Sequence, residues 1–239
     1  MKKIFSGITI LLCSKLYAYG ELISPIPSTF LEVSTPNTHI VDKTESSYIL
    51  RGSTPKNKDD IQSLITFGVK KIIILKNQTR NEVDEEIKDI QSLGFEKNNI
   101  IHLPLKWRDF FLLKTQCELS LQALKEIKAA LELKQSLYFH CTVGEDRTGH
   151  LSALWKFYRN PTHSAEELFL SEMCAYGFEA KNPNKPMKNV NDIRAFLTPL
   201  YFRMIDFLKR ELSQGKTLEE MVCPDEEFYP DYHMLRVCP

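Results

Sequence analysis

The sequence predicts an α/β protein with a mostly parallel central sheet flanked by helices and a helical carboxyl-terminal region. Three observations predict this fold class. Short apolar segments alternate with amphipathic segments between about residues 47 and 158, which is typical of strands joined by crossover helices. Residues 69–75 are rich in β-branched side chains, as expected of a strand buried on both faces. Beyond about residue 160 the apolar residues follow helical spacing only.

The first elements of the alternation follow directly from local signals. Residues 47–50 favour a short strand that ends at residues 51–53. Residues 59–67 carry apolar side chains at helical spacing, and Gly68 supplies a helix stop because glycine readily takes a left-handed conformation. The β-branched run at residues 69–75 is the next strand.

The second part of the alternation repeats this unit. The helix expected at residues 82–93 has acidic residues in its first turn, as is typical of a helix amino terminus, and Gly94 follows its last turn. The predicted elements in chain order are a helix at 82–93, a strand at 100–105, a helix at 120–133, a strand at 137–140 and a helix at 148–158.

Two further helices and an acidic tail are expected after this alternation. Residues 164–167 form a capping box for a helix that ends at Gly177. Thr198 and Pro199 predict the start of a long helix that ends before Gly215. Residues 216–239 carry six acidic residues against two basic ones, which is typical of a solvated surface.

The amino-terminal residues have the pattern of an export signal. Two lysines precede a short apolar stretch that cannot span a bilayer, so residues 1–20 are expected to form a cleavable secretory signal peptide. The exported protein would be periplasmic or secreted. A lipid anchor at Cys13 and a buried amino-terminal element are the alternatives. Residues 21–46, rich in Ser, Thr and Pro, are expected to form an irregular lead-in to a domain at 47–215.

Composition excludes several classes of protein. With 43% hydrophobic and 26% charged residues, the chain is neither collagen-like nor disordered, and it is not a multi-span membrane protein. Its 31 basic and 31 acidic residues give no electrostatic reason to expect a nucleic-acid partner. No stable membrane insertion is expected, and the oligomeric state is left open.

One segment between a predicted strand and a predicted helix carries chemistry. Unpaired backbone N–H groups of a helix amino terminus bind anions, and the helix dipole adds partial positive charge there. An arginine in the same place fits a phosphate group with two parallel hydrogen bonds. These groups favour a cysteine thiolate, and a glycine lets the backbone approach closely. The segment reads His140-Cys141-Thr142-Val143-Gly144-Glu145-Asp146-Arg147-Thr148-Gly149.

This segment resembles the signature loop of cysteine-based protein tyrosine phosphatases, which is His-Cys, five residues, Arg and Ser or Thr. Residues 48–53, 68–75 and 103–105 look like the compact dual-specificity branch, which includes bacterial members. The resemblance covers about residues 46–160. The phosphatase domain is expected at 47–215, with the acidic tail at 216–239 after it. The loop Thr142–Arg147 would bind the substrate phosphate, and neither a cofactor nor a metal is implied.

The resemblance also implies a role for each loop residue. Cys141 would be the nucleophile that forms a phosphocysteine, and Arg147 would bind the phosphate. Thr148 would assist departure of the thiolate, and His140 would orient the loop. A general acid is needed as well, because an alkoxide or phenoxide leaves poorly. Asp109 is expected to be this acid, since it resembles the aspartate of the family's mobile loop.

Two carboxylates within the loop affect the expected chemistry. Asp146 is the rival candidate for the general acid. Glu145 and Asp146 together are expected to place two carboxylates on the rim, which would repel a highly phosphorylated ligand. The basic residues Lys106, Arg108 and Lys114 would offset that charge from the general-acid loop or simply face solvent.

The remaining cysteines are consistent with export. Removal of the signal leaves five, and a free nucleophile at Cys141 leaves four for two disulfides. These are Cys117, Cys174, Cys223 and Cys238. The pairing is not fixed by the sequence, and we hypothesise that one bridge joins Cys223 to Cys238, which would close a loop in the tail.

The expected function is therefore that of an exported, cysteine-dependent phosphatase without a metal. A phosphorylated protein is the first expected substrate class, and an inositol phosphate or phosphoinositide is the alternative. A domain that binds phosphorylated partners without turnover, and a sulfur-transfer enzyme, are the readings from other classes.

Overall fold

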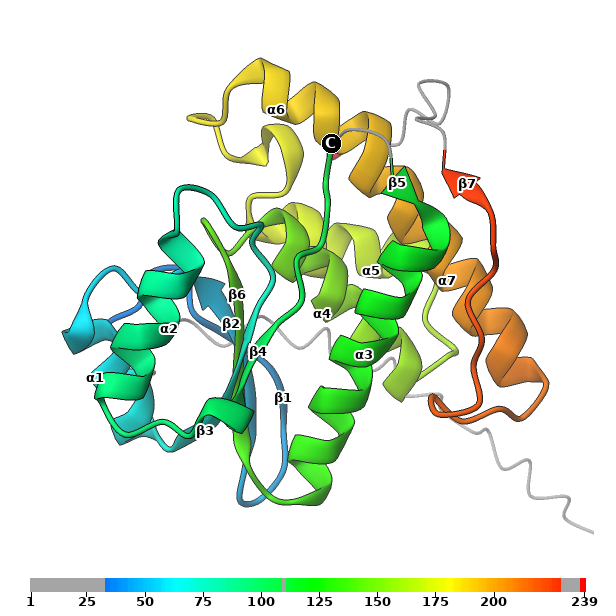
Figure 1. The fold of residues 1–239 in the computed structure, drawn as a ribbon. Coiled ribbons are helices and arrows are strands. Elements are labelled where there is room, and N and C mark those ends of the chain that lie inside the picture. Colours follow the sequence, from blue (N-terminus) through cyan, green and yellow to red (C-terminus); the bar gives the residue numbers. More distant parts are fainter. Residues whose placement is uncertain (1–32, 109–110, 229–236) are drawn as a thin grey trace, which may run out of the picture.

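The computed structural model describes residues 33–108, 111–228 and 237–239. Its centre is a five-stranded sheet with the order β1-β2-β6-β3-β4 (Figure 1). β1 is antiparallel to β2, and the other neighbours are parallel. The strands are β1 (His39–Lys43), β2 (Tyr48–Ser53), β3 (Val69–Ile74), β4 (Ile100–His102) and β6 (Ser136–Cys141).

Helices cover both faces of this sheet, as predicted. α1 (Lys58–Phe67) and α2 (Glu82–Ser92) lie on one face, while α3 (Leu113–Glu132) and α4 (Asp146–Arg159) lie on the other (Figure 1). The β3 strand explains the need for two layers, because Ile72 and Ile74 pack into one core cluster and Ile73 into the other. Successive strand residues point to opposite faces, so a continuous apolar run requires cover on both sides.

The carboxyl-terminal region is helical and adds an outer layer. α5 (Ala165–Leu168) continues through a π-helical segment, Phe169–Met173, and a short 3₁₀ turn to Gly177. α6 (Met187–Asp192) continues through the π-helical segment Ile193–Leu197 into α7 (Thr198–Ser213). Thr198 therefore does not cap a free helix end, and its hydroxyl instead donates to the buried carboxylate of Glu179 at 2.8 Å.

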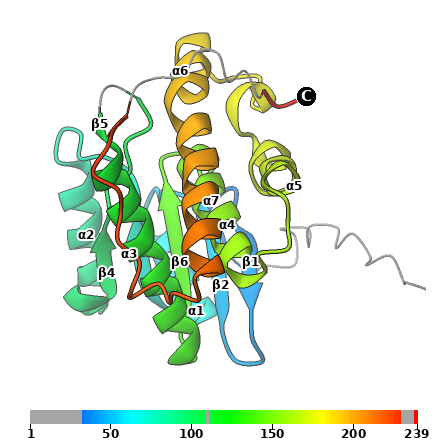
Figure 2. The same ribbon diagram turned by 90° about the vertical axis from the view of Figure 1, so that its right-hand side faces the viewer.

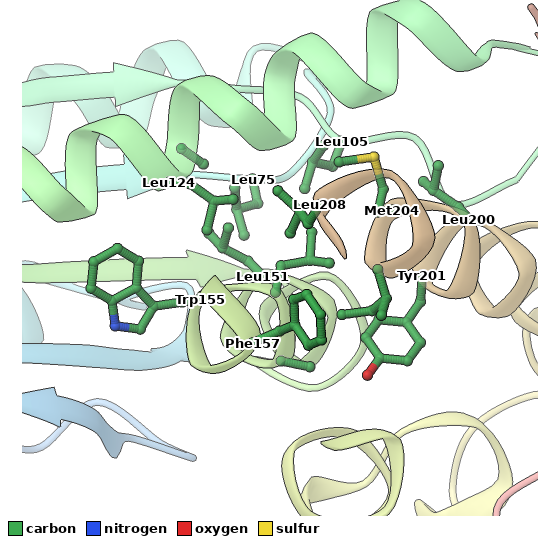
Figure 3. Packing of buried hydrophobic residues seen from close by; sticks show 14 of the residues in the cluster. Leu75, Leu105, Leu124, Leu151, Trp155, Phe157, Leu200, Tyr201, Met204 and Leu208 are labelled. Carbon is green, nitrogen blue, oxygen red and sulfur yellow. The ribbon is translucent and has the colours of Figure 1, made fainter. Parts of the chain in front are cut away.

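α7 packs against α4 and closes the larger core cluster. Figure 3 shows side chains from α4 and α7 meeting others from α3 and from the chain that follows β3 and β4. Among the described residues no helix is long and apolar enough to cross a membrane. The labelled side chains of this cluster are Leu75, Leu105, Leu124, Leu151, Trp155, Phe157, Leu200, Tyr201, Met204 and Leu208.

The prediction of an irregular lead-in at residues 21–46 is wrong over β1. Residues 1–32, including the expected signal peptide, lie outside the described residues. β1 is an edge strand with an irregular register between Ile40 and Asp42, and only Val41 in it is buried. An edge strand needs few apolar side chains, so the polar composition of this segment concealed it.

One strand and one helix show the largest further differences from their predicted bounds. The strand expected at 100–105 ends at His102, but the chain continues beside β3 because the N–H groups of Leu103 and Leu105 donate to Ile74 and Leu75. Pro104 has no N–H group, which prevents regular pairing there. The helix expected at 120–133 begins earlier, at Leu113.

The acidic tail is not simply a solvated surface. Leu218, Met221 and Cys223 are buried, and the tail runs beside α3 (Figure 2). β7 (Glu227–Phe228) forms a two-stranded antiparallel sheet with β5 (Phe111–Leu112). Three apolar residues spaced along an acidic segment were too weak a signal to indicate this packing.

The disulfide hypothesis is wrong in its pairing and right in its number. Cys223 bonds Cys117 on α3, and Cys238 bonds Cys174, so the expected Cys223–Cys238 bridge does not exist. Cys141 is the free cysteine of the described residues. The two bridges attach the tail to the domain at two separate points, which a bridge within the tail would not do.

We predict that the bridge to α3 is a major source of stability. It joins residues 106 apart in sequence, and closing a loop of that size restricts the unfolded chain. The double substitution Cys117→Ala/Cys223→Ala is expected to lower the free energy of unfolding by about 2–5 kcal/mol. Urea unfolding with and without reductant measures this. Equal stability of the variant and the unreduced wild type would contradict the prediction.

Candidate active site

The loop that joins β6 to α4 lies at the carboxyl edge of the parallel strands. Cys141 is the last residue of β6, and Asp146 is the first residue of α4. Both views place α6 beyond this edge (Figures 1 and 2). The Cys141 side chain is 1% exposed and unbonded to another cysteine, so the thiol lies at the bottom of the loop.

The carbonyl groups of this loop all point to donors outside it. Each C=O accepts a hydrogen bond on the side of the loop that faces the protein interior. The N–H groups on the opposite side of the peptide units therefore remain available to an anion. The first turn of α4 adds N–H groups that have no partner within the helix. The carbonyls and their donors are His140 with Leu75 N, Cys141 with Thr54 Oγ1, Thr142 with Thr54 N, Val143 with Asn37 Nδ2, Gly144 with Asn37 Nδ2 and Arg51 Nη2, and Glu145 with Arg51 Nη2.

Arg51, from β2, is the central support behind the loop. Its guanidinium is buried and donates to the carbonyls of Gly144 and Glu145 at 3.0 and 3.1 Å. It also donates to the carbonyl of Glu172 at 2.6 Å and to Thr148 Oγ1 at 3.2 Å. Burial lowers the pKa of Arg51 from its ordinary value, an effect that the nearby Glu172 carboxylate opposes.

Gly144 allows the loop to approach the sheet closely. It has φ +75°, and a Cβ atom there would collide with the backbone of Gly52 and Ser53 at the end of β2. Only glycine combines this left-handed conformation with so little space. The loop is therefore seated directly on the neighbouring strand.

Arg147 and Thr148 occupy the first turn of α4, where they were predicted to act. Arg147 is buried, and it donates to the Leu75 carbonyl at 3.2 Å and to Thr142 Oγ1 at 3.1 Å. The Thr148 hydroxyl accepts from Arg51, so its own proton is free to point elsewhere. The structure thus brings both residues to the loop that holds Cys141.

His140 connects the loop to a buried charge pair. Its Nε2 lies 2.8 Å from a carboxylate oxygen of Glu86, and its Nδ1 lies 3.3 Å from Thr54 Oγ1. Glu86 in turn pairs with Lys76 at 2.9 Å. Burial would raise the pKa of Glu86, but His140 and Lys76 together hold it below its ordinary value. These contacts fix the orientation of the His140 ring.

Glu145 and Asp146 are not the free rim carboxylates that the sequence suggested. Lys185 reaches both, at 3.1 Å from Glu145 Oε2 and 2.6 Å from Asp146 Oδ1. Asn182 Nδ2 donates to Glu145 at 2.8 Å, and the Glu179 N–H donates to Asp146 at 3.2 Å. Burial raises the pKa of both carboxyl groups, while Lys185 acts in the opposite direction.

A pocket of about 260 Å³ opens above Cys141 and Arg147. Trp107 lines one side of it, and the segment from Asn182 to Ile193 lines another. Val143 and Met187 are 44% and 62% exposed, Val143 on the pocket wall and Met187 beside Pro186, which also lines it.

Two further predictions concern residues near this pocket. Asp109, the expected general acid, lies outside the described residues, so its position stays a prediction. Of the basic residues near it, Lys114 lies 3.7 Å from Asp225 and Arg108 stacks over the Trp107 ring at 5.1 Å. Over the described part of the chain, no cluster of three or more His, Cys, Asp or Glu side chains is arranged to hold a metal ion.

Sequence reasoning missed several residues that shape the site. Asn37 and Thr54 hold loop carbonyls, yet Asn37 falls in the segment taken for an irregular lead-in. Lys185 and Asn182 come from the carboxyl-terminal region, where no motif indicated a role. Only Arg51 had a signal, since it belongs to a segment that carried the family resemblance.

Comparison with known proteins identifies the family of this chain. A family model described as the tyrosine phosphatase family matches residues 34–157. The chain belongs to this family, and it is a cysteine-dependent phosphatase. No curated protein in the sequence search matches the chain.

Solved structures with a related fold include two bacterial phosphatases and one from yeast. TpbA of Pseudomonas aeruginosa is 18% identical, with a TM-score of 0.49 over 76% of this chain and 92% of its own. The core catalytic domain of the PP-IP phosphatase SIW14 from Saccharomyces cerevisiae is 19% identical, with a TM-score of 0.47 over 77% and 95%. A putative phosphatase from Shewanella putrefaciens is 12% identical, with a TM-score of 0.47 over 77% and 95%.

We predict that Asn37 contributes to activity by holding the loop. Asn37→Ala leaves the Val143 carbonyl without its donor, which is expected to lower kcat/KM for an aryl phosphate by about tenfold. The melting temperature should fall modestly, because alanine is strained at the φ of +55° that Asn37 adopts and the hydrogen bond to His39 Nε2 is lost. Asn81→Ala is the matched control, since Asn81 is exposed, has φ +66° and lies before α2, so its replacement introduces the same backbone strain away from the loop. Equal activity of the two variants would contradict the role of Asn37.

Proposed function

We propose that this chain hydrolyses phosphomonoesters through a phosphocysteine at Cys141 and acts on proteins phosphorylated on tyrosine, serine or threonine. One observation carries the proposal. Every loop carbonyl from His140 to Glu145 is bound from outside the loop, which leaves the loop N–H groups to receive an anion above a buried, unbonded thiol.

The reaction has two displacement steps. In the first, the Cys141 thiolate attacks phosphorus, the bond from phosphorus to the leaving oxygen breaks, and that oxygen takes a proton from the general acid. Arg147 and the loop N–H groups hold the three other oxygens. In the second, a water molecule attacks phosphorus, its proton passes to the general acid, which the first step left as a carboxylate, and the bond to sulfur breaks. Thr148 donates its hydroxyl proton in a hydrogen bond to the departing thiolate, since Arg51 already occupies its acceptor side.

Asp109 is the proposed general acid. Trp107 lines the pocket above Cys141, so the chain reaches the pocket just before Asp109. The rival Asp146 is less suited to reach a leaving oxygen, because Lys185 and the Glu179 N–H both bind its Oδ1 and hold the carboxyl group toward the carboxyl-terminal region.

A monophosphorylated residue of a protein fits this pocket better than a polyphosphate. Lys185 is already paired with Glu145 and Asp146, so the pocket holds no surplus of positive charge for additional phosphate groups. Trp107, Val143 and Ile193 give its wall apolar surface that suits an aromatic or aliphatic side chain. Inositol phosphates and phosphoinositides are therefore the alternative substrates.

Export is proposed as well. Two disulfides support it, because such bonds persist in oxidising compartments and are rare in reducing ones. The basic and apolar pattern of residues 1–20 supports the same conclusion.

The proposed function is tested by phosphate release from a panel of substrates. The panel contains phosphotyrosine and phosphoserine peptides, phosphoinositides and soluble inositol phosphates, each assayed in EDTA with the wild type and Cys141→Ser. We expect the peptides to be preferred, and residual activity of the variant below about a thousandth. Preference for the inositides would support the alternative substrates. Binding without release by the wild type would instead indicate a domain that only binds phosphorylated partners.

Asp109→Ala tests the general acid. The substitution should slow turnover by roughly 10²–10⁴ for alkyl phosphates, whose leaving groups need a proton. Activated aryl phosphates should be affected much less, because their phenolates leave without help. Asp146→Asn serves as the comparison. An equal loss of activity on both substrate types in Asp109→Ala would argue against this role.

A further inference from the structure

Lys185 is a buried lysine at the mouth of the active site, and its ammonium group has several partners. Its side chain is only 6% exposed, although it belongs to the short segment that precedes α6. The ammonium contacts three acceptors, which are Asp146 Oδ1 at 2.6 Å, the Gly177 carbonyl at 3.0 Å and Glu145 Oε2 at 3.1 Å. A buried lysine with this many partners is held in one place.

The two carboxylates that Lys185 contacts belong to the phosphate-binding loop itself. Asp146 directly precedes Arg147, and both line the pocket above Cys141. Two uncompensated negative charges at this position would oppose the entry of a phosphate dianion. Both carboxylates lie within residues 34–157, the segment that matches the family. Without a positive partner, their negative charge would weaken phosphate binding by the loop.

The compensating charge comes from outside that matched segment. Gly177, with φ +87°, allows the chain to approach the Glu145 side chain, because a Cβ there would collide with it. Asn182 then donates to Glu145, and the Glu179 N–H donates to Asp146. The carboxyl-terminal region thus contacts both loop carboxylates through three separate donors.

We propose that Lys185 is a positioning residue that partly compensates the negative charge of Glu145 and Asp146 and thereby sets the affinity of the loop for a phosphate dianion. Asn182 and the Glu179 N–H fix the positions of the two carboxylates, so that the single Lys185 ammonium contacts both. The inference rests on the proposed function in assigning a phosphate group to this loop. It does not depend on which phosphomonoester is the substrate.

The test measures binding of inorganic phosphate by calorimetry in the Cys141→Ser protein. Lys185→Met should weaken phosphate binding by about tenfold or more, since a buried charge pair is left uncompensated. In the enzyme with Cys141, the same substitution should raise KM with little change in kcat, as expected for binding shared by ground and transition states. Lys188→Met on α6 is the matched control, because Lys188 is exposed, and it should leave both values unchanged.

Removal of the carboxylates separates charge compensation from mechanical support. The triple variant Glu145→Gln/Asp146→Asn/Lys185→Met should recover phosphate affinity to within about threefold of the parent. Glu145→Gln/Asp146→Asn with Lys185 retained should bind phosphate more tightly than the parent, a result that remains readable even if Lys185→Met fails to fold.

Three results would overturn the proposal. They are unchanged affinity in a folded Lys185→Met protein, a triple variant as weak as the single one, and a double variant no tighter than the parent. Failure of the proposed function has a different signature, because phosphate binding by the Cys141→Ser protein would follow the expected order while the wild type released no phosphate.

Discussion

A buried guanidinium holds together the parts of this molecule that make the active site. A loop that offers its N–H groups to an anion must turn its carbonyls the other way, and those carbonyls need donors inside the protein. Arg51 supplies them for Gly144 and Glu145, and it also binds Thr148 on α4 and the carbonyl of Glu172. One side chain from β2 thereby fixes the loop, the catalytic helix and the carboxyl-terminal region relative to the sheet.

The carboxyl-terminal region completes the site as well as the core. Its buried Glu179 binds Arg194 at 3.1 Å, the Thr198 hydroxyl at 2.8 Å and the backbone N–H of Cys238 at 3.3 Å. The Cys174–Cys238 bridge attaches the chain end to the same place. These contacts hold the segment that carries Lys185 beside the loop, so the packing of this region and the charge of the site depend on each other.

The sequence predicted what local chemistry specifies. The alternation of apolar segments predicted the sheet and its helices, and the segment from His140 to Gly149 predicted the position of the loop. Local sequence patterns could not predict contacts between segments that are distant in the chain. Nothing local to Asn37 or Lys185 indicates a partner more than thirty residues away, and four equivalent cysteines do not disclose their pairing. β1 was missed because an edge strand needs little apolar patterning.

If Cys141 is the nucleophile, it becomes phosphorylated during turnover. Acid-quenched wild-type protein, taken during turnover of an aryl phosphate, can be digested and examined by mass spectrometry. We expect one added phosphoryl group on the peptide that contains Cys141. It should be more abundant in Thr148→Ala, whose hydrolysis step is slowed, and absent in Cys141→Ser. Turnover in which this peptide stays unmodified in both the wild type and Thr148→Ala, or a phosphoryl group on another residue, would contradict this expectation.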